Sequence, residues 1–329
     1  MHHHHHHMEK YYVEVKAYPT IGILLLGGVS DNKKRLPRHT TAGIAYTGLD
    51  DDIYVKTDLY LSNQKSGIIN GKEVSPDSPR SPFVVIDKYR HEILMRHPEY
   101  SEVSFVSENK NVISGSSDAG AAAIGECIQS IFEYNINIFN FENDLQQISE
   151  SAGRSMFGGF TINHANGKES LTDEILGPED FEDFVIVACK FSEDRKPSDT
   201  IHSNIINHEK YAERVKNSEL RAKELEKMAD SGDIKGIFEA GEKDTQEYHS
   251  MLREVGVSII TDEMQRLIEK VEELKAEFWN AYIVTGGTNV FVAVERKNME
   301  KMKNAAMEFK CTPVYLKVAG KPDVISKNF

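Results

Sequence analysis

Residues 114–118 have the types and the spacing of a phosphate-binding turn. Their letters, SGSSD, follow a strand-like NVI and open an alanine-rich run that predicts a helix. In such a turn several backbone N–H groups meet the positive end of the helix dipole, which favours a bound phosphate. The alternative is an ordinary helix cap by serine or aspartate, and the absence of a following Lys-Ser or Lys-Thr pair excludes a Walker loop. The predicted phosphate-binding residues are Ser114, Gly115, Ser116, Ser117 and Asp118, with the hydroxyl of Ser117 as a candidate magnesium ligand.

Glu150 and Arg154 form the second candidate group. They are four residues apart in ENDLQQISESAGRSMFGGF, so one continuous helix would place both on the same face, beside the small Ala152 and Gly153. Arginine binds a carboxylate or phosphate through two N–H groups, and glutamate accepts a hydrogen bond from a hydroxyl. The alternative is a surface ion pair of little energetic value.

An α+β fold must position these groups. Runs of β-branched and alternating residues predict strands in the first third of the chain, and alanine- and isoleucine-rich periodicity predicts helices after it. The strands are expected at 11–17, 21–26, 41–47, 53–61 and 103–107, and the helices at 118–134 and 142–156.

The second half combines a helical region with a few strands. A strand at 184–191 precedes helices between 208 and 279, with a turn at 231–233. Two strands, 281–285 and 289–295, enclose a Gly-Gly turn that contains Thr285 at its start, for which an ordinary hairpin is the alternative reading. A helix at 298–309 and a last strand at 313–318 follow. The predicted division is a tag at 1–7, an N-terminal domain at 8–183 and a C-terminal domain at 184–329.

Composition limits the classes of function. The 52 acidic residues exceed the 39 basic ones and give a net charge of −13, which argues against a nucleic-acid partner. No apolar run reaches the length of a membrane helix, so no membrane partner is expected. The three cysteines form no CxxC pair, so we expect reduced thiols in a cytoplasmic protein. The histidines of the native chain form no close pair, so the sequence does not predict a transition-metal site. A magnesium ion held mainly by substrate phosphates would leave no sequence pattern.

Three segments, in this order along the chain, give the sequence a family resemblance. LPRHTT at 36–41, ISGSSDAGAAAIG around the phosphate turn and SAGRSMFGGF around Arg154 resemble the motifs of the GHMP kinase superfamily, in its diphosphomevalonate decarboxylase branch. The resemblance implies a two-domain GHMP kinase fold, with a mixed sheet and helices in the N-terminal domain and a ferredoxin-like C-terminal domain. It also implies ATP as co-substrate with Mg²⁺, and a homodimer.

Two departures from that branch change the expected substrate. The branch has a lysine in its first strand, where this chain has Leu25, and an aspartate where this chain has Thr285. A diphosphate site without its cation would be costly, so the substrate should carry less negative charge. Together with AYPTIG, which contains Thr20, the departures resemble the archaeal mevalonate 3-kinases.

That resemblance implies a reaction and a set of roles. ATP would phosphorylate the tertiary 3-hydroxyl of mevalonate without decarboxylation. Arg154 and Arg195 would bind the carboxylate or screen the transferred phosphoryl group, and Glu150 would orient a hydroxyl. Leu25, Thr20 and Thr285 would shape the substrate site. The alternatives are a decarboxylase of a phosphorylated mevalonate and a catalytically silent nucleotide-binding homologue.

Overall fold

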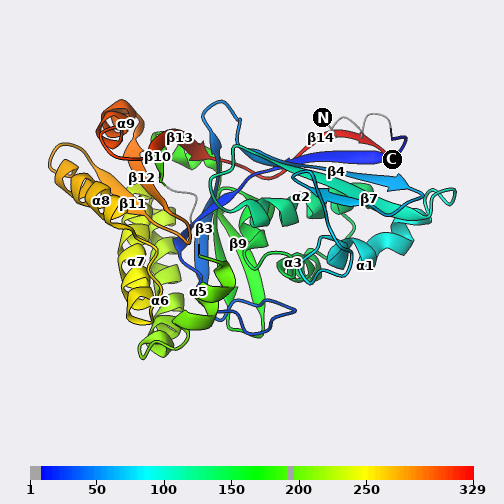
Figure 1. Cartoon of the computed structure of the whole chain (residues 1–329), viewed down its shortest axis with the longest axis horizontal. Coiled ribbons are helices and arrows are strands. Elements are labelled where there is room, and N and C mark those ends of the chain that lie inside the picture. Colours follow the sequence, from blue (N-terminus) through cyan, green and yellow to red (C-terminus); the bar gives the residue numbers. More distant parts are fainter. Residues whose placement is uncertain (1–8, 192–195) are drawn as a thin grey trace.

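The computed structural model describes residues 9–191 and 196–329. The molecule is elongated, with one sheet and helices α1 to α3 at one end and helices α6 to α9 at the other (Figure 1). The predicted α+β class is confirmed, because antiparallel sheets carry helices that pack on their faces.

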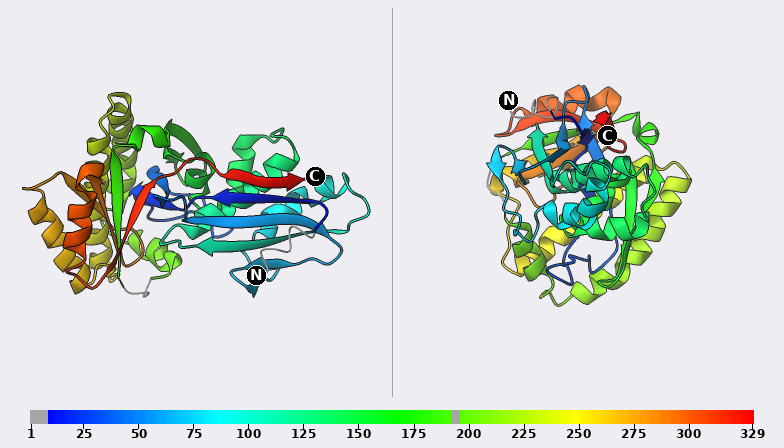
Figure 2. Two further views of the ribbon diagram at one scale, coloured as in Figure 1. Left: turned by 90° about the horizontal axis from the view of Figure 1, so that it is seen from above. Right: turned by 90° about the vertical axis from the view of Figure 1, so that its right-hand side faces the viewer.

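The first sheet lies at the end of the molecule that holds both described termini. Its strand order is β14-β1-β4-β7-β5-β6, and β14, β1, β4 and β7 run side by side in the left-hand view of Figure 2. The strand bounds are β1 Tyr12–Ala17, β4 Tyr54–Ser62, β5 Gly67–Ile69, β6 Lys72–Glu73, β7 Glu102–Lys110 and β14 Asp323–Asn328. One face of β1 and β4 is covered by the alanine-rich helix α2, whose small side chains allow close packing on the sheet.

The second sheet joins strands from both predicted domains. Its order is β11-β12-β10-β13-β3-β8-β9, and β2 pairs with β3 beside this path. The bounds are β2 Thr20–Leu24, β3 Thr41–Gly48, β8 Phe160–Ala165, β9 Ser170–Leu176, β10 Phe184–Lys190, β11 Asn280–Ile283, β12 Asn289–Glu295 and β13 Thr312–Val318. Because β13 pairs with β3 and β14 pairs with β1, strand pairing crosses the boundary expected after residue 183, which stays a prediction.

The helices differ in how they bury their apolar residues. Helix α2 is buried along most of its length, whereas α6 and α7 are long, charged helices that pack on each other and bury one stripe each. The bounds are α1 Phe83–Leu94, α2 Ser116–Ile131, α3 Ile138–Gln146, α4 Ala152–Phe157, α5 Ser198–Ile205, α6 Tyr211–Asp230, α7 Ile234–Glu254, α8 Asp262–Leu274 and α9 Met299–Ala306, with short 3-10 helices at Pro178–Phe181 and Arg296–Asn298. In the described part of the chain, no helix combines the length and the apolar character needed to cross a membrane.

The structure corrects the predicted elements in two ways. The helix expected at 142–156 is two helices, α3 and α4, with a break between Gln146 and Ala152. Elements that the sequence analysis omitted are α1, α5, the short strands β5 and β6, β8, β9 and the final strand β14. The other predicted strands and helices are confirmed to within a few residues at their ends.

Candidate functional site

A cavity of about 190 Å³ lies where β2, α2, α4, α5 and α7 approach one another. All the predicted site residues except Arg195 line this cavity: Thr20, Leu25, Ser114, Gly115, Ser116, Ser117, Asp118, Glu150, Arg154 and Thr285. Arg195 lies outside the described residues. The structure therefore brings together side chains that are up to 265 positions apart in the sequence, which is the distance from Thr20 to Thr285.

The phosphate turn is held by contacts that require its glycine. Gly115 has φ 76°, and a Cβ at this position would lie 2.5 Å from the backbone nitrogen of Thr20. On its other side the Tyr46 hydroxyl donates to the carbonyl oxygen of Ser114 at 2.6 Å and accepts from the Ser114 N–H at 3.0 Å. Tyr46 and Thr20 thereby fix the turn against β2 and β3, so its amides have a defined direction.

The start of α2 is open to a ligand. Among the side chains that the structure describes, none caps the helix at Gly115, so its first N–H groups are available at the cavity. Within the described residues, the buried hydroxyl oxygen Oγ of Ser114 also has no hydrogen-bond partner. These groups can bind an anion with several oxygens, as expected for a phosphate.

Asp118 is not a helix cap. Its carboxylate accepts a hydrogen bond from the Thr20 hydroxyl at 2.6 Å and another from the Ser149 hydroxyl. Burial raises the pKa of the Asp118 carboxyl, and the nearby Arg154 charge and the two hydroxyl donors oppose that rise. A carboxylate with a raised pKa at the cavity is a candidate acceptor for a proton.

Arg154 presents a buried guanidinium to the cavity. The residue is 7% exposed, and among the described residues its Nε and Nη2 atoms have no hydrogen-bond partner. Burial lowers the pKa of Arg154, while the nearby Asp118 and Glu150 charges oppose this. A buried cation without hydrogen-bond acceptors is costly, so this site is suited to an anionic ligand.

Two glycines make room for that arginine. Gly22 and Gly43 are direct partners across β2 and β3. A Cβ on Gly43 would lie 2.6 Å from Nε of Arg154, and one on Gly22 would lie 3.5 Å from its Nη1. The side chain of Arg154 therefore crosses the strand pair in a groove that only glycine leaves open.

Glu150 is held by two arginines and a histidine that come from elsewhere in the chain. Its Oε2 atom accepts from Nε of Arg35 at 3.1 Å and from Nη2 of Arg80 at 3.2 Å, and its Oε1 accepts from Nε2 of His202 at 3.1 Å. Burial raises the pKa of the Glu150 carboxyl, but the His202 hydrogen bond and the arginine charges outweigh burial and hold that pKa well below its ordinary value. Because Glu150 lies in the turn before α4, it does not share a helix face with Arg154, and that expectation was wrong.

His202 connects Glu150 to the segment after β2. Its Nδ1 accepts from the backbone N–H of Gly28 at 3.1 Å, which places the ring proton on Nε2, the atom that faces Glu150. Leu25 and Thr285 lie at the same cavity, with Leu25 buried and Thr285 half-buried.

The sequence analysis missed Arg35, Arg80, Ser149 and His202. Arg80 and Ser149 line the cavity with His202, and Arg35 approaches it through Glu150. Arg35, Arg80 and His202 are 115, 70 and 52 positions from Glu150, so no local spacing connects them to it. Of these four residues, only Ser149 could have been suspected from the local sequence. It lies next to Glu150, and a serine within a helical pattern can form side-chain hydrogen bonds that compete with the helix.

The described residues contain no cluster of three or more His, Cys, Asp or Glu side chains that could hold a metal ion. Ser117 is at the cavity, but the carboxylate of Asp118 next to it already accepts hydrogen bonds from Thr20 and Ser149. This donor set fits a cation that takes most of its ligands from phosphates and water.

Comparison with known proteins identifies the family. A model of the diphosphomevalonate decarboxylase-like N-terminal domain matches residues 17–173, and a model of the mevalonate-3-kinase C-terminal domain matches residues 196–300. The mevalonate-3-kinase of Picrophilus torridus is 58% identical over 98% of this chain and 100% of its own length. The mevalonate 3-kinase of Thermoplasma acidophilum is 42% identical over 92% of this chain and 95% of its own.

A solved structure agrees with these matches. Mevalonate-3-kinase from Thermoplasma acidophilum, with mevalonate 3-phosphate and ADP bound, superimposes with a TM-score of 0.92 at 39% identity, over 97% of this chain and 100% of that one. The diphosphomevalonate decarboxylase of Staphylococcus aureus, at 17% identity and a TM-score of 0.79, shares the fold. The chain belongs to the mevalonate 3-kinase family, on the GHMP kinase fold that it shares with the diphosphomevalonate decarboxylases.

Proposed function

We infer that this chain transfers the γ-phosphoryl group of ATP to the tertiary 3-hydroxyl of mevalonate, giving mevalonate 3-phosphate and ADP without decarboxylation. The observation that carries the inference is the buried guanidinium of Arg154, which has free N–H groups in the described structure and faces the same cavity as the phosphate turn. A small carboxylate beside a nucleotide phosphate satisfies both halves of that cavity. Family membership supports the same substrate pair.

The nucleotide occupies the amide-lined turn and a neighbouring cavity. A second cavity of about 300 Å³ adjoins the first and shares Arg80, Ser116 and Ser117 with it. Its remaining lining is mostly apolar, with Val55, Ile69, Ile124 and Ile148, which suits a planar purine ring. The phosphates then extend from the purine to the start of α2, where the amides of residues 115–118 bind them.

Mevalonate occupies the side of the cavity that contains Arg154 and Leu25. Arg154 binds the carboxylate, with Arg195 as a second cation. Glu150 accepts hydrogen bonds from Arg35, Arg80 and His202 and still has a lone-pair position for a substrate hydroxyl, since a carboxylate offers about four such positions. Leu25 contacts the apolar part of the substrate, and Thr285 forms part of the wall.

Phosphoryl transfer depends mainly on alignment and on charge screening, so it tolerates the absence of an aspartate at position 285. Asp118 is our candidate for the group that accepts the hydroxyl proton, because burial raises its pKa and Thr20 links it to the cavity. Mg²⁺, with Ser117 as the protein ligand nearest the phosphates, would neutralise charge on the transferred group. Decarboxylation needs stabilisation of a developing cationic carbon, and the uncharged Leu25 and Thr285 offer none.

The product of the reaction tests this function. Protein incubated with ATP, Mg²⁺ and mevalonate should give ADP and a mevalonate monophosphate whose phosphorus signal shows no coupling to CH₂ protons, because the 3-hydroxyl carbon carries none. Phosphorus NMR and mass spectrometry read both. A 5-phosphate, isopentenol or CO₂ would refute the assignment, and ATP hydrolysis that ignores mevalonate would favour the silent-homologue alternative. Parallel incubation with mevalonate 5-phosphate and 5-diphosphate tests the decarboxylase alternative.

We also propose a homodimer in the cytoplasm. All three cysteines are free thiols, which suits a reducing compartment, and the homodimer follows from the family resemblance. Light scattering after size-exclusion chromatography measures the mass and distinguishes a dimer from the 37.2 kDa monomer.

A further inference from the structure

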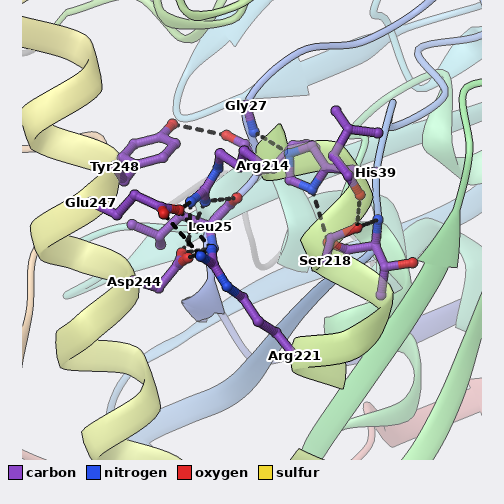
Figure 3. Close-up of polar contacts among 12 residues, drawn as sticks. Leu25, Gly27, His39, Arg214, Ser218, Arg221, Asp244, Glu247 and Tyr248 are labelled. Carbon is purple, nitrogen blue, oxygen red and sulfur yellow. Dashed lines mark hydrogen bonds and ion pairs between the residues drawn. The ribbon is translucent and has the colours of Figure 1, made fainter. Parts of the chain in front are cut away.

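The segment that follows β2, residues 25–28, is held by side chains of helices that lie far away in the sequence. We call residues 25–28 the strap. Tyr248 donates to the carbonyl oxygen of Leu26 at 2.8 Å, and the N–H of Gly27 donates to Nε2 of His39 at 3.1 Å (Figure 3). Tyr211 donates to the carbonyl oxygen of Gly27. The backbone of the strap is therefore fixed by α6 and α7 rather than by a neighbouring strand alone.

The backbone N–H and C=O of Leu25 both form hydrogen bonds with one ion pair. The N–H of Leu25 donates to Oδ2 of Asp244 at 2.7 Å, and Nη2 of Arg214 donates to the carbonyl oxygen of Leu25 at 2.9 Å. Asp244 and Arg214 also bond each other twice, at 2.9 and 3.0 Å, in the fork geometry typical of arginine and a carboxylate. Together the pair contacts both polar groups of the Leu25 peptide backbone (Figure 3).

The pair is buried, with Arg214 and Asp244 side chains 3% and 2% exposed. Burial lowers the pKa of Arg214, but the Asp244 charge and hydrogen bonds outweigh it and leave that pKa raised. A buried ion pair contributes little net stability relative to apolar residues of the same size, because desolvation offsets the attraction. Its distinctive effect here is geometric, since it fixes the two peptide groups on either side of the Leu25 Cα against two helices.

The Cα between these two peptide groups carries the side chain that borders the substrate. A Cβ built on Gly22 would lie 2.7 Å from Cδ2 of Leu25 and 3.5 Å from Nη1 of Arg154. Leu25 therefore lies directly over Gly22, next to the guanidinium that binds the substrate carboxylate. A shift of Leu25 by a fraction of an ångström changes the space available beside Arg154.

We propose that Arg214 and Asp244 are positioning residues that set mevalonate affinity by fixing Leu25 in the cavity wall. The inference rests on the proposed function, because it concerns the same substrate. Leu25 contacts the bound substrate before and during phosphoryl transfer, so misplacing it weakens ground-state binding and raises the KM for mevalonate more than it lowers kcat. The nucleotide site is built from α2 and is unaffected.

The first test compares two variants one helical turn apart on α7. Asp244→Asn removes the charge that pairs with Arg214 and contacts Leu25. Glu247→Gln is the matched control, because Glu247 also bonds Nη1 of Arg214, at 2.6 Å, whereas the described structure has no hydrogen bond from Glu247 to the strap. We expect Asp244→Asn to raise the mevalonate KM about tenfold, the effect of losing one charge-assisted hydrogen bond, with the ATP KM changed less than twofold. Glu247→Gln should leave both KM values within about twofold of wild type.

A double-mutant cycle with Leu25→Ala separates positioning from general damage. If Asp244 acts through Leu25, the Asp244→Asn change should have little further effect on mevalonate KM in the Leu25→Ala background. Multiplicative effects, a parallel rise in the ATP KM, or an equal effect of Glu247→Gln would overturn the inference. If Asp244→Asn does not fold, Arg214→Lys gives the same comparison, since lysine cannot bond Asp244 twice and Leu25 as well.

The outcomes also separate this inference from the proposed function. A wild-type protein without mevalonate-dependent ADP formation refutes the proposed function, and this inference falls with it. Normal wild-type turnover combined with an unchanged mevalonate KM in Asp244→Asn refutes the positioning role alone.

Discussion

Arg154 shows how this site is prepared for its ligand. Its guanidinium is buried against β2 and β3, yet Nε and Nη2 find no acceptor among the described residues. A charge in this state lowers the stability of the ligand-free protein and raises the affinity for an anion that completes its hydrogen bonds. The residue therefore trades stability for binding, as functional groups commonly do.

Replacing Arg154 by methionine should separate these two effects. The variant keeps an unbranched, flexible side chain without its charge, so kcat/KM for mevalonate should fall by at least about a hundredfold, the effect of removing a bidentate charged contact. Without ligand, the variant should lose at most about 0.5 kcal/mol of unfolding free energy relative to wild type. Steady-state kinetics and urea unfolding measure the two. A loss of stability of several kcal/mol would contradict the view that Arg154 is held there for binding.

Some residues of the site could be predicted from the sequence, and others could not. Ser114, Gly115, Glu150 and Arg154 lie in short motifs, where type and spacing already indicate a task. Arg35, Arg80 and His202 surround Glu150 only because tertiary packing brings a loop, another loop and α5 to the turn before α4. These contacts join residues far apart in the sequence, so no local pattern could predict them.

At the scale of elements, the site depends on how the start of α2 meets β2. Gly115 begins the helix and lies against the backbone of Thr20, and Thr20 in turn bonds Asp118 in the first turn of α2. The nucleotide and substrate halves of the cavity are thus connected through Thr20, which contacts both Gly115 and Asp118.

Gly115→Ala should disturb that contact. The new Cβ would lie 2.4 Å from the carbonyl oxygen of Thr20 and would also force alanine to φ 76°. We expect a loss of about 1–3 kcal/mol in unfolding free energy and at least a tenfold weaker affinity for ADP, measured by calorimetry. Gly256→Ala is the control, because Gly256 has φ 85° with nothing within 4 Å of the added Cβ. Equal losses of ADP affinity in both variants would show that the contact with Thr20 is unimportant.

The break between α3 and α4 explains why one predicted helix was wrong. The segment has helical periodicity, but its Ser149 hydroxyl bonds Asp118 and its Glu150 carboxylate turns toward Arg35, Arg80 and His202. Tertiary hydrogen bonds overrode local propensity there. The long helices α6 to α8 and the hydrophobic strands β10 and β12 were predictable, because packing and propensity agree in them. Strand β14 was not, since its exposed, polar sequence gains its structure by pairing with β1.

At the scale of the molecule, charge is distributed unevenly. The net charge is −13, yet Arg35, Arg80 and Arg154 gather at the cavity that should bind two anionic ligands. The first sheet contains the opposite case. Asp58 of β4 is buried and lies opposite Glu14 of β1, and burial together with the Glu14 charge raises the pKa of Asp58 to about 8.

Asp58 should make the folded protein less stable as pH rises. Between about pH 5 and 8 the unfolded chain has lost this proton, since an ordinary aspartate has a pKa of about 3.9, while the folded protein retains it. Unfolding free energy should therefore fall by about 1 kcal/mol per pH unit as pH approaches 8, and level off above it. The buried His39 and His249, with pKa values lowered by burial to about 4, bind protons only in the unfolded chain between about pH 4 and 7. Their contribution to stability therefore rises with pH in that range, and the Asp58 effect is best read between about pH 7 and 8.

Asp58→Asn should flatten this slope, as measured by urea unfolding at several values between pH 7 and 8. Asp230→Asn, at the exposed end of α6, is the control and should keep the wild-type slope. An unchanged slope in Asp58→Asn would show that other groups carry the pH dependence.

The pairing of β14 with β1 has a consequence for the order in which the parts of the protein can fold during synthesis. Tyr12 of β1 pairs with Asn328 of β14, so the first sheet lacks a strand until residues 323–328 have left the ribosome. Until then β1 offers an unpaired edge, and such edges invite association with other chains. The cavity residues of β2 and α2 are synthesised early, but the sheet behind them closes last. During translation the N-terminal half should therefore be the part that most needs protection by chaperones, although it is the first to emerge.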